Sequence, residues 1–417
     1  MSLASSALSL VRSLRVLGAE RAWLLGVLTA GHFVIHWFQQ SLPVILPTLK
    51  ADLGLSHVEV GALSSAQQMV AGLGQLPLGI AADSLVRHRA AILALSLASM
   101  GTAYFLLGAG WFFAALVGSG LVGLGTALWH PAAAGVLSNR FPERRGTALS
   151  IHGTGATLSD TITPFCVGFL LASFSWRGLT QAQLVPGLLF GFLLWRALTT
   201  ALGDGGPAPA SASGQLRDVA RLLRDAAFLG VSAATGLLQM GRLVVLTFFP
   251  IYLQEHLGYT SVGVGGFVAL LHVMGIVSQP VLGLLSDRFG RKAVLVPSCL
   301  ALGLFFALLA AAPAGAALAL VVLVTGVFFY TIFNIMNAAV MDVAGSNIQS
   351  STYGLTFLIT QLAVIPTPML TGYLIGAWGI RSAFVLAGIF LLVGAAVIAP
   401  LKLYGGTRAQ QPASARK

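Results

Sequence analysis

Two histidines lie in the first long apolar stretch of the chain, residues 21–46. His32 and His36 are four residues apart, which places them on one face of a helix. Because histidine changes charge near neutral pH, the pair could relay protons or bind a substrate; a neutral histidine bonded to a neighbouring helix backbone is the structural alternative. The same spacing can chelate a divalent ion. The chain has no HExxH motif and no acid within reach on this stretch, so we predict no metal site and no cofactor.

A carboxyl group lies near the middle of another apolar stretch, residues 146–174. Asp160 is the only acidic residue near the centre of such a stretch. An ionisable group in an apolar medium is costly and is normally kept for a function, and a partly hydrated carboxyl group there can take up and release a proton. We therefore predict that Asp160, His32 and His36 carry protons. The alternative is a permanently neutral carboxyl group that braces neighbouring hydroxyl groups.

A single basic residue, Arg242, lies near the middle of the apolar stretch 224–251. Its guanidinium group keeps its charge and therefore needs an anion, which could be a substrate carboxylate or phosphonate, or Asp160 in one conformation. A structural ion pair is the alternative. His272 lies at a depth similar to that of Asp160 and is a candidate partner for it. We predict a substrate site formed by Arg242, His130, Gln40, His272 and Asn334.

The elements that carry these residues are membrane-spanning helices. The chain is 57% hydrophobic and only 8% charged, with a mean hydropathy of +0.88, which excludes an ordinary soluble domain. About 20 apolar residues are needed to cross a hydrocarbon core about 30 Å thick. We predict an all-α membrane protein with twelve spans, at residues 21–46, 58–80, 90–109, 111–138, 146–174, 180–201, 224–251, 261–285, 293–312, 316–343, 351–376 and 380–404.

The sequence contains an internal repeat. The segment GLLSDRFGRK at 283–292 has a diverged copy, GIAADSLVRH, at 79–88. The same offset in numbering relates other glycines and prolines, and a constant offset over so many residues indicates two homologous six-helix halves. The pairs it relates are Gly61 with Gly265, Pro164 with Pro368 and Gly168 with Gly372.

The basic residues define an orientation. With the N-terminus inside, nineteen Lys and Arg residues fall in cytoplasmic segments, and Lys50, Arg177 and Arg381 fall on the other face. Positive residues are retained on the cytoplasmic side during insertion, so both termini are predicted to be cytoplasmic in a bacterial inner membrane. This asymmetry accounts for the net charge of +11, which indicates contact with anionic lipids and requires no nucleic-acid partner.

We predict five segments along the chain. Residues 1–20 form a cytoplasmic or interfacial lead-in, and residues 21–201 form the N-terminal six-helix bundle. Residues 202–223 form a cytoplasmic linker, because they begin with the flexible sequence LGDGGPAPASASG. Residues 224–404 form the C-terminal six-helix bundle, and the polar tail 405–417 is predicted to be disordered.

Six plus six helices, a central linker and GxxxDRxGRK between the second and third helices of a half resemble the major facilitator superfamily. The resemblance implies that the first and fourth helices of each half line a central cavity and that the fifth and eighth helices of the chain meet. It also implies a cytoplasmic gate, in which an Asp caps a helix and pairs with Arg while Gly permits close packing. The gate residues it implies are Gly79, Asp83, Arg87, Gly283, Asp287, Arg288, Gly290 and Arg291.

The first half resembles a narrower group, the fosmidomycin-resistance proteins. The resemblance is carried by His32 with the FVIHWFQQSLPVILPTL that follows it, by WHP at 129–131 and by RRGTALSIHGTGATLSDTITP at 144–164. This chain departs from the group's pattern at His36, Ala132, Asp160 and Thr163, so the group's substrate and proton residues cannot be transferred to it.

The chain has no GxxxxGK[ST] phosphate loop, so we expect no ATP site and favour secondary transport. The leading hypothesis is a monomeric, proton-driven antiporter that exports a drug-like or anionic compound by alternating access. A proton-coupled uptake symporter for an organic acid or other small anion is the alternative. An intramembrane enzyme or scaffold is a third hypothesis, but the sequence offers no catalytic constellation and we predict that the protein is not an enzyme.

Overall fold

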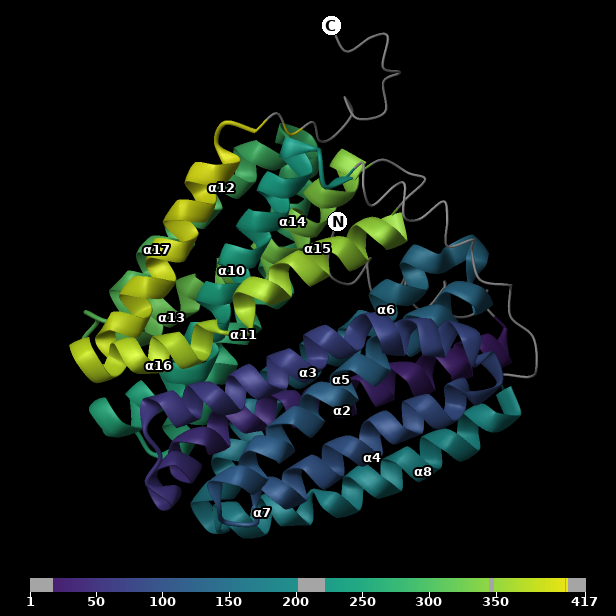
Figure 1. Cartoon of the computed structure of the whole chain (residues 1–417), viewed down its shortest axis with the longest axis horizontal. Helices are drawn as coiled ribbons and strands as arrows, with labels where there is room; N and C mark the ends of the chain where they lie inside the picture. Colours follow the sequence, from purple (N-terminus) through teal and green to yellow (C-terminus); the bar gives the residue numbers. More distant parts are fainter. Residues whose placement is uncertain (1–17, 202–221, 345–348, 402, 404–417) are drawn as a thin grey trace, which may run out of the picture.

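The computed structural model describes residues 18–201, 222–344, 349–401 and 403, and within these ranges the regular structure is helical (Figure 1). The first half contains α2 (Ala19–Leu53), α3 (His57–Ser84), α4 (Arg89–Leu107), α5 (Phe112–Arg140), α6 (Arg145–Ser173), α7 (Trp176–Ala182) and α8 (Leu184–Ala201), with short 3₁₀ turns η1 (Val86–His88) and η2 (Pro142–Arg144). The second half contains α10 (Ala226–Ile251), the π-helical turn η3 (Tyr252–His256), α11 (Ser261–Phe289), α12 (Arg291–Leu309), α13 (Ala316–Phe329), α14 (Thr331–Ala344), α15 (Gln349–Val364), α16 (Thr367–Trp378) and α17 (Arg381–Ile398).

Local sequence signals explain where several helices begin and end. Gly54 adopts a left-handed conformation with φ of 64° and ends α2, a geometry that glycine tolerates best. Ser56 and Glu59 then form a capping box that starts α3. Asp225 begins α10 by accepting hydrogen bonds from the backbone amides of residues 227 and 228 at 2.8 and 2.9 Å.

Ten helical segments among the described residues are long and apolar enough to cross a membrane. The two remaining predicted spans, 21–46 and 58–80, coincide with α2 and α3, which are 35 and 28 residues long. Both carry polar side chains that lower their hydropathy. The all-α membrane fold predicted from the sequence is therefore confirmed. Three predicted spans are each built from two helices, namely α7 with α8, α13 with α14 and α15 with α16.

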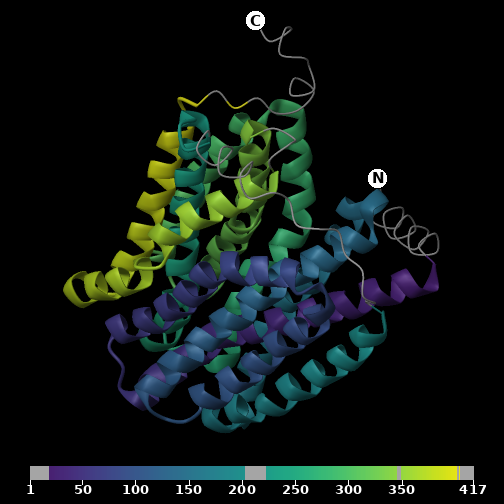
Figure 2. The same ribbon diagram turned by 45° about the vertical axis from the view of Figure 1, so that its right-hand side comes forward.

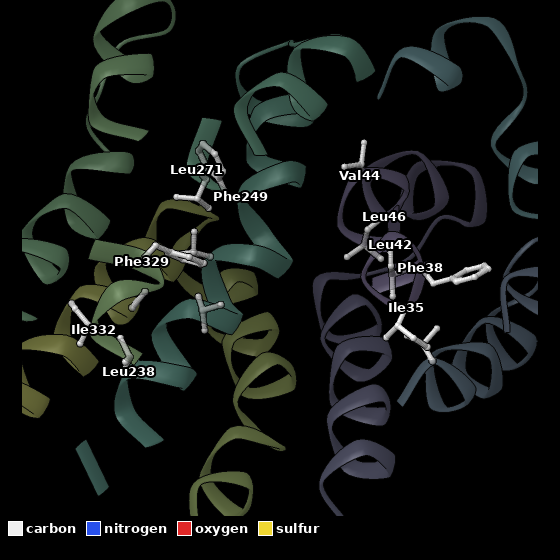
Figure 3. Packing of buried hydrophobic residues seen from close by; sticks show 14 of the residues in the cluster. Ile35, Phe38, Leu42, Val44, Leu46, Leu238, Phe249, Leu271, Phe329 and Ile332 are labelled. Atoms are coloured by element: carbon white, nitrogen blue, oxygen red, sulfur yellow. The ribbon is translucent and has the colours of Figure 1, made fainter. Parts of the chain in front are cut away.

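The helices form two groups that lie side by side (Figure 1, Figure 2). In the first half α5 packs against α3 and α4, α4 against α8, and α2 against α6. In the second half α17 packs against α10 and α12, and α11 against α13. Figure 3 shows buried side chains of both groups, among them Ile35 and Phe38 of α2 and Leu238 and Phe249 of α10. The segments predicted at 1–20, 202–223 and 405–417 lie mostly outside the described residues.

Two helix crossings join the groups, α3 with α16 and α6 with α11. At the first, Gly61 lies against the backbone of Pro368, and at the second, Gly265 lies against the backbone of Pro164 and Gly168. The repeat found in the sequence relates Gly61 to Gly265 and Pro368 to Pro164, so the two crossings are the same contact made twice. A side chain at either glycine would separate the helices.

Two further contacts between the groups lie toward the end of the molecule where α2 finishes. Lys50 of α2 pairs with Glu255 of η3 at 2.8 Å, and Thr247 of α10 donates a hydrogen bond to Ser64 of α3 at 3.1 Å. From this end the groups diverge toward the end where α3 and α11 finish (Figure 1, Figure 2). We call the end with the Lys50–Glu255 pair the closed end. It carries Lys50, Arg177 and Arg381, the basic residues that the charge count assigns to the outer face.

Candidate functional site

Asp160 of α6 is bonded to two side chains of α2. Its Oδ1 atom lies 2.7 Å from Nδ1 of His36 and accepts a hydrogen bond from Nε2 of Gln40 at 2.9 Å. His36 and Gln40 are one turn apart on α2 and therefore face the same neighbour. The side chains of His36 and Asp160 are 17% and 11% exposed, respectively. Two polar side chains of α2 therefore hold a largely buried carboxyl group, and His36 is slightly more exposed than the carboxyl group that it contacts.

His32 lies one turn before His36 and packs against two aromatic rings. Its ring stacks on that of His152 with centroids 4.1 Å apart, and Trp129 lies parallel to both. The His32 Nδ1 atom lies 3.0 Å from the backbone oxygen of His152. Its other nitrogen, Nε2, is buried without a hydrogen-bond partner.

His130 of α5 completes a cluster of histidines with His32 and His36. Its Nδ1 atom lies 2.9 Å from the backbone oxygen of Thr126 in its own helix. Its ring centroid is 5.5 Å from that of His32 and 6.1 Å from that of His36. The structure therefore brings three of the predicted site histidines together from α2 and α5.

Arg242 of α10 lies buried in the other half, with its guanidinium carbon above three aromatic rings. The distances to the ring centroids are 4.4 Å for Tyr330, 4.8 Å for Phe329 and 5.4 Å for Phe333. One guanidinium nitrogen donates to Oε1 of Gln239 at 2.6 Å, and Nε is buried without a partner. The aromatic faces stabilise the cation, but they do not replace an anion.

Charged and polar groups of the two halves lie close to one another around Asp160 and Arg242. Asp160 lies within electrostatic range of Arg242 and of His272 of α11, and Tyr330 lies near both Arg242 and Gln40. His272 directs Nδ1 to the backbone oxygen of its own helix at 2.7 Å. The sequence suggested His272 as the partner of Asp160, but the hydrogen-bonding partners are His36 and Gln40, because α6 packs along α2.

Asn334 was predicted to bind substrate and lies elsewhere. Its side-chain amide donates to Oε1 of Gln279 at 2.9 Å, joining α14 to α11. The residue is exposed. No described contact connects Asn334 to the groups around Asp160 and Arg242, so its assignment to the substrate site stays a prediction.

The predicted gate of the second half is a hydrogen-bonded turn between α11 and α12. Arg291 donates from Nε to Asp342 of α14 at 2.8 Å and from a terminal nitrogen to Asp287 at 2.5 Å. Gly290 has φ of 95° and makes the turn, a conformation that favours glycine. The Arg288 guanidinium group lies over the adjacent phenyl ring at 5.3 Å. Arg291 thus ties three helices together at the end where the halves diverge.

Close packing is not seen at two glycines of the gate among the described residues. There, a Cβ atom at Gly283 would meet no atom within 4 Å, and one at Gly79 would lie an ordinary 3.6 Å from Pro131. The role of these glycines in the gate stays a prediction. Arg87 lies in η1 just after α3, and the side chain of Asp83 lies outside the described part of the chain.

Sequence reasoning missed three residues of the site. His152 lies eight residues before Asp160 on the same helix, a spacing of two successive four-residue steps that could have indicated a shared face. Tyr330 and Gln239 contact Arg242. Gln239 lies three residues before it on α10, a visible helical neighbour, but Tyr330 comes from another helix and gave no such signal.

Residues 28–368 match the Major Facilitator Superfamily. The chain belongs to this superfamily. The hexuronate transporter of Bacillus subtilis (strain 168) is 25% identical to it over 413 residues, which cover 91% of this chain and 96% of that transporter. A bacterial homolog of the human lysosomal transporter Spinster superposes with a TM-score of 0.74 at 16% identity, covering 91% of this chain and 97% of that one. At this identity the structural likeness shows the fold alone.

The narrower resemblance to the fosmidomycin-resistance group has partial support. The fosmidomycin resistance protein of Escherichia coli (strain K12) is 24% identical over 151 residues, 36% of this chain and 37% of that protein. The comparisons therefore support membership of the superfamily but give only partial support to the narrower group. This protein is a multi-pass membrane transporter of a small molecule, and a family of transporters agrees with the expectation that it is not an enzyme.

Proposed function

We propose that the protein is a proton-coupled secondary transporter of a small organic anion, which binds Arg242 while a proton binds Asp160. One observation carries the proposal. A buried carboxyl group of the first half and a buried guanidinium group of the second half interact electrostatically, and the guanidinium group retains an unpaired buried N–H. Charged groups inside a membrane protein are costly unless they are compensated.

The charges explain how proton and anion would be coupled. In the empty site, ionised Asp160 compensates Arg242. A proton alone would neutralise Asp160 and leave Arg242 uncompensated, and an anion alone would place two negative charges beside one positive charge. Both half-loaded states are unfavourable in a medium of low dielectric constant. Proton and anion therefore bind and leave together, which is the requirement for symport.

The neighbours of Asp160 supply a route for the proton. His36 is hydrogen-bonded to the carboxyl group and is partly exposed, and a histidine can exchange protons near neutral pH. Gln40 donates a second hydrogen bond that fixes the same oxygen atom. His36 would pass the proton, and Gln40 would hold Asp160 in position.

Transport would proceed by rocking of the two halves around this site. The glycine crossings and the Lys50–Glu255 pair close one end, and the gate around Arg291 lies at the other. The distribution of basic residues favours the closed end as the outer face of a bacterial inner membrane, with cytoplasmic termini. The protein would act as a monomer.

Export in exchange for protons is the second candidate. It is favoured by the partial similarity to the fosmidomycin resistance protein of Escherichia coli. In that case proton and substrate would compete for the site instead of binding together. The symport proposal is preferred because opposite charges at Asp160 and Arg242 favour joint binding over competition.

The experiment is transport of radiolabelled glucuronate, a hexuronate, into proteoliposomes with an imposed pH gradient. Symport predicts accumulation above equilibrium when the outside is acidic, and its loss when a proton ionophore is added. Liposomes without protein are the control. Accumulation only with an acidic interior would support the export candidate, and fosmidomycin is the second probe for that arm. Gradient-independent equilibration of both probes would contradict proton coupling.

A further inference from the structure

The histidine cluster has a property that proton transfer does not require. One ring nitrogen from each of His32, His36 and His130 lies within 4.8 Å of the other two. His32 and His36 lie one turn apart on α2, and His130 comes from α5. Three imidazoles converging on one point are a donor set typical of zinc and related divalent ions.

The hydrogen bonds of the three rings fix which nitrogen is free. The Nδ1 atoms of His32 and His130 face backbone oxygens at 3.0 and 2.9 Å. A carbonyl oxygen only accepts, so each Nδ1 carries the hydrogen and each Nε2 has a lone pair. The Nδ1 atom of His36 faces the Asp160 carboxylate at 2.7 Å, which fixes the same tautomer. All three Nε2 atoms are therefore available as ligands.

This pattern is the one found around metal-binding histidines. Such a histidine almost always donates its other ring N–H to a carboxylate or a backbone carbonyl, which orients the ring and increases its basicity. Here two rings donate to carbonyls and one to a carboxylate. His32 Nε2 is also buried without a partner, and the residue is only 8% exposed. A buried acceptor without a donor is unfavourable, and a cation would remove that deficit.

We infer that the Nε2 atoms of His32, His36 and His130 form a site for a divalent transition-metal ion of the zinc class, with Asp160 as the outer carboxylate. Tetrahedral coordination at Zn–N distances of about 2.0–2.1 Å places ligand nitrogens about 3.4 Å apart. One ring nitrogen of each histidine lies within 4.8 Å of the other two, so the rings must move closer together to bind an ion. His36 and His130 are partly exposed, and water or an anion would supply the fourth ligand.

The sequence predicted no metal site because it has no HExxH motif and no acidic residue within reach of the histidine pair on its own apolar stretch. The third ligand comes from α5, and the carboxylate that orients His36 comes from α6. The inference does not rest on the proposed transport activity, because binding is measured on purified protein without transport. It does carry a consequence for transport. An ion on His36 would keep Asp160 ionised as its outer partner and would block proton uptake.

The test is titration of tag-free, chelator-stripped protein in detergent with Co²⁺, followed by competition with Zn²⁺. We expect one ion per chain, the intense visible spectrum of four-coordinate Co²⁺ and its displacement by Zn²⁺. His32→Gln and His130→Gln should each weaken binding by more than the loss for Asp160→Asn, which should be about 10- to 100-fold as for an outer-shell partner. His256→Gln is the control, since this exposed histidine of η3 lies outside the cluster.

Each outcome decides the inference. A weak, six-coordinate spectrum in the unaltered protein would overturn it without any variant. Affinity that is unchanged in His32→Gln and His130→Gln would assign binding to other residues and would also overturn it. Graded losses in the cluster variants with full affinity in His256→Gln would establish the site. The result is independent of glucuronate transport, which tests the proposed function separately.

Discussion

The crossing of α6 and α11 offers the sharpest test of how the halves move, because two adjacent glycines of α11 have opposite surroundings. A Cβ atom added at Gly265 would collide with the backbone oxygen of Pro164 and lie 3.0 Å from the Cα atom of Gly168. A Cβ atom added at Gly266 would meet nothing within 4 Å. Gly265→Ala therefore strains the closed crossing, and Gly266→Ala is its matched control.

The magnitude follows from the rigidity of the atoms that would be displaced. Gly265→Ala acts on the backbone of α6, which cannot rotate away as a flexible side chain could. Overpacking of this kind costs about 1–3 kcal/mol. If that strain is relieved when the outer end opens, the ratio of open to closed states rises about 5- to 150-fold, since about 1.4 kcal/mol is tenfold. Gly61→Ala should act in the same way at the symmetry-related crossing.

The assay is a distance measurement between spin labels across the closed end. Labels at Ala51 and Ala314, which are exposed on opposite halves at this end, would follow its opening after Cys166 and Cys299 are replaced by serine. In the parent protein and in Gly266→Ala we expect one short distance. In Gly265→Ala we expect a second, longer population.

Two results would refute this reasoning. An unchanged distance distribution in Gly265→Ala would mean that the crossing absorbs a methyl group without opening. A longer distance in both Gly265→Ala and Gly266→Ala would mean that any added methyl group on α11 disturbs the helix. Thermal stability of all variants in detergent separates opening of one end from general unfolding.

Further predictions concern the ion pairs and the anion site. Arg242→Gln should weaken glucuronate binding measured by calorimetry by about 10- to 150-fold, because a hydrogen bond to a charged group contributes about 1.5–3 kcal/mol; an unchanged Kd would remove Arg242 from the site. Glu255→Gln breaks the partly exposed pair with Lys50 and should open the closed end far less than Gly265→Ala, because such pairs contribute about 0.2–1 kcal/mol. Its effect should shrink in high salt, and a salt-independent effect would contradict a screened ion pair.

The fold could be predicted from the sequence, whereas the candidate site could be predicted only in part, and the roles of its residues stay predictions. Long apolar stretches, the repeat and the gate motif predicted helices that the structure confirms, because hydropathy and helix length are local properties. Asp160, His36 and Arg242 were found because a charge within an apolar stretch is visible in one dimension. The repeat related Gly61 to Gly265 and Pro164 to Pro368, but the structure was needed to show that these residues meet in two crossings.

The contacts among these residues could not be derived in the same way. Asp160 was assigned to His272 by depth, but its partner is set by the packing of α6 on α2, which no local pattern encodes. The rings around Arg242 are ordinary apolar residues in sequence, and only the fold places them beneath the cation. His130, the third histidine of the cluster, was predicted as a site residue from the sequence, but its distance from His32 depends on how α5 packs against α2.

If Asp160 carries the transported proton, Asp160→Asn should separate glucuronate exchange from proton uptake. Asparagine keeps the shape and hydrogen-bonding capacity of a protonated carboxyl group but cannot release a proton. The measurement follows an internal pH-sensitive dye during glucuronate transport in proteoliposomes, with exchange of internal and external glucuronate measured in parallel. The variant should still exchange glucuronate but lose substrate-dependent proton uptake and accumulation. Proton uptake equal to that of the unaltered protein would contradict it.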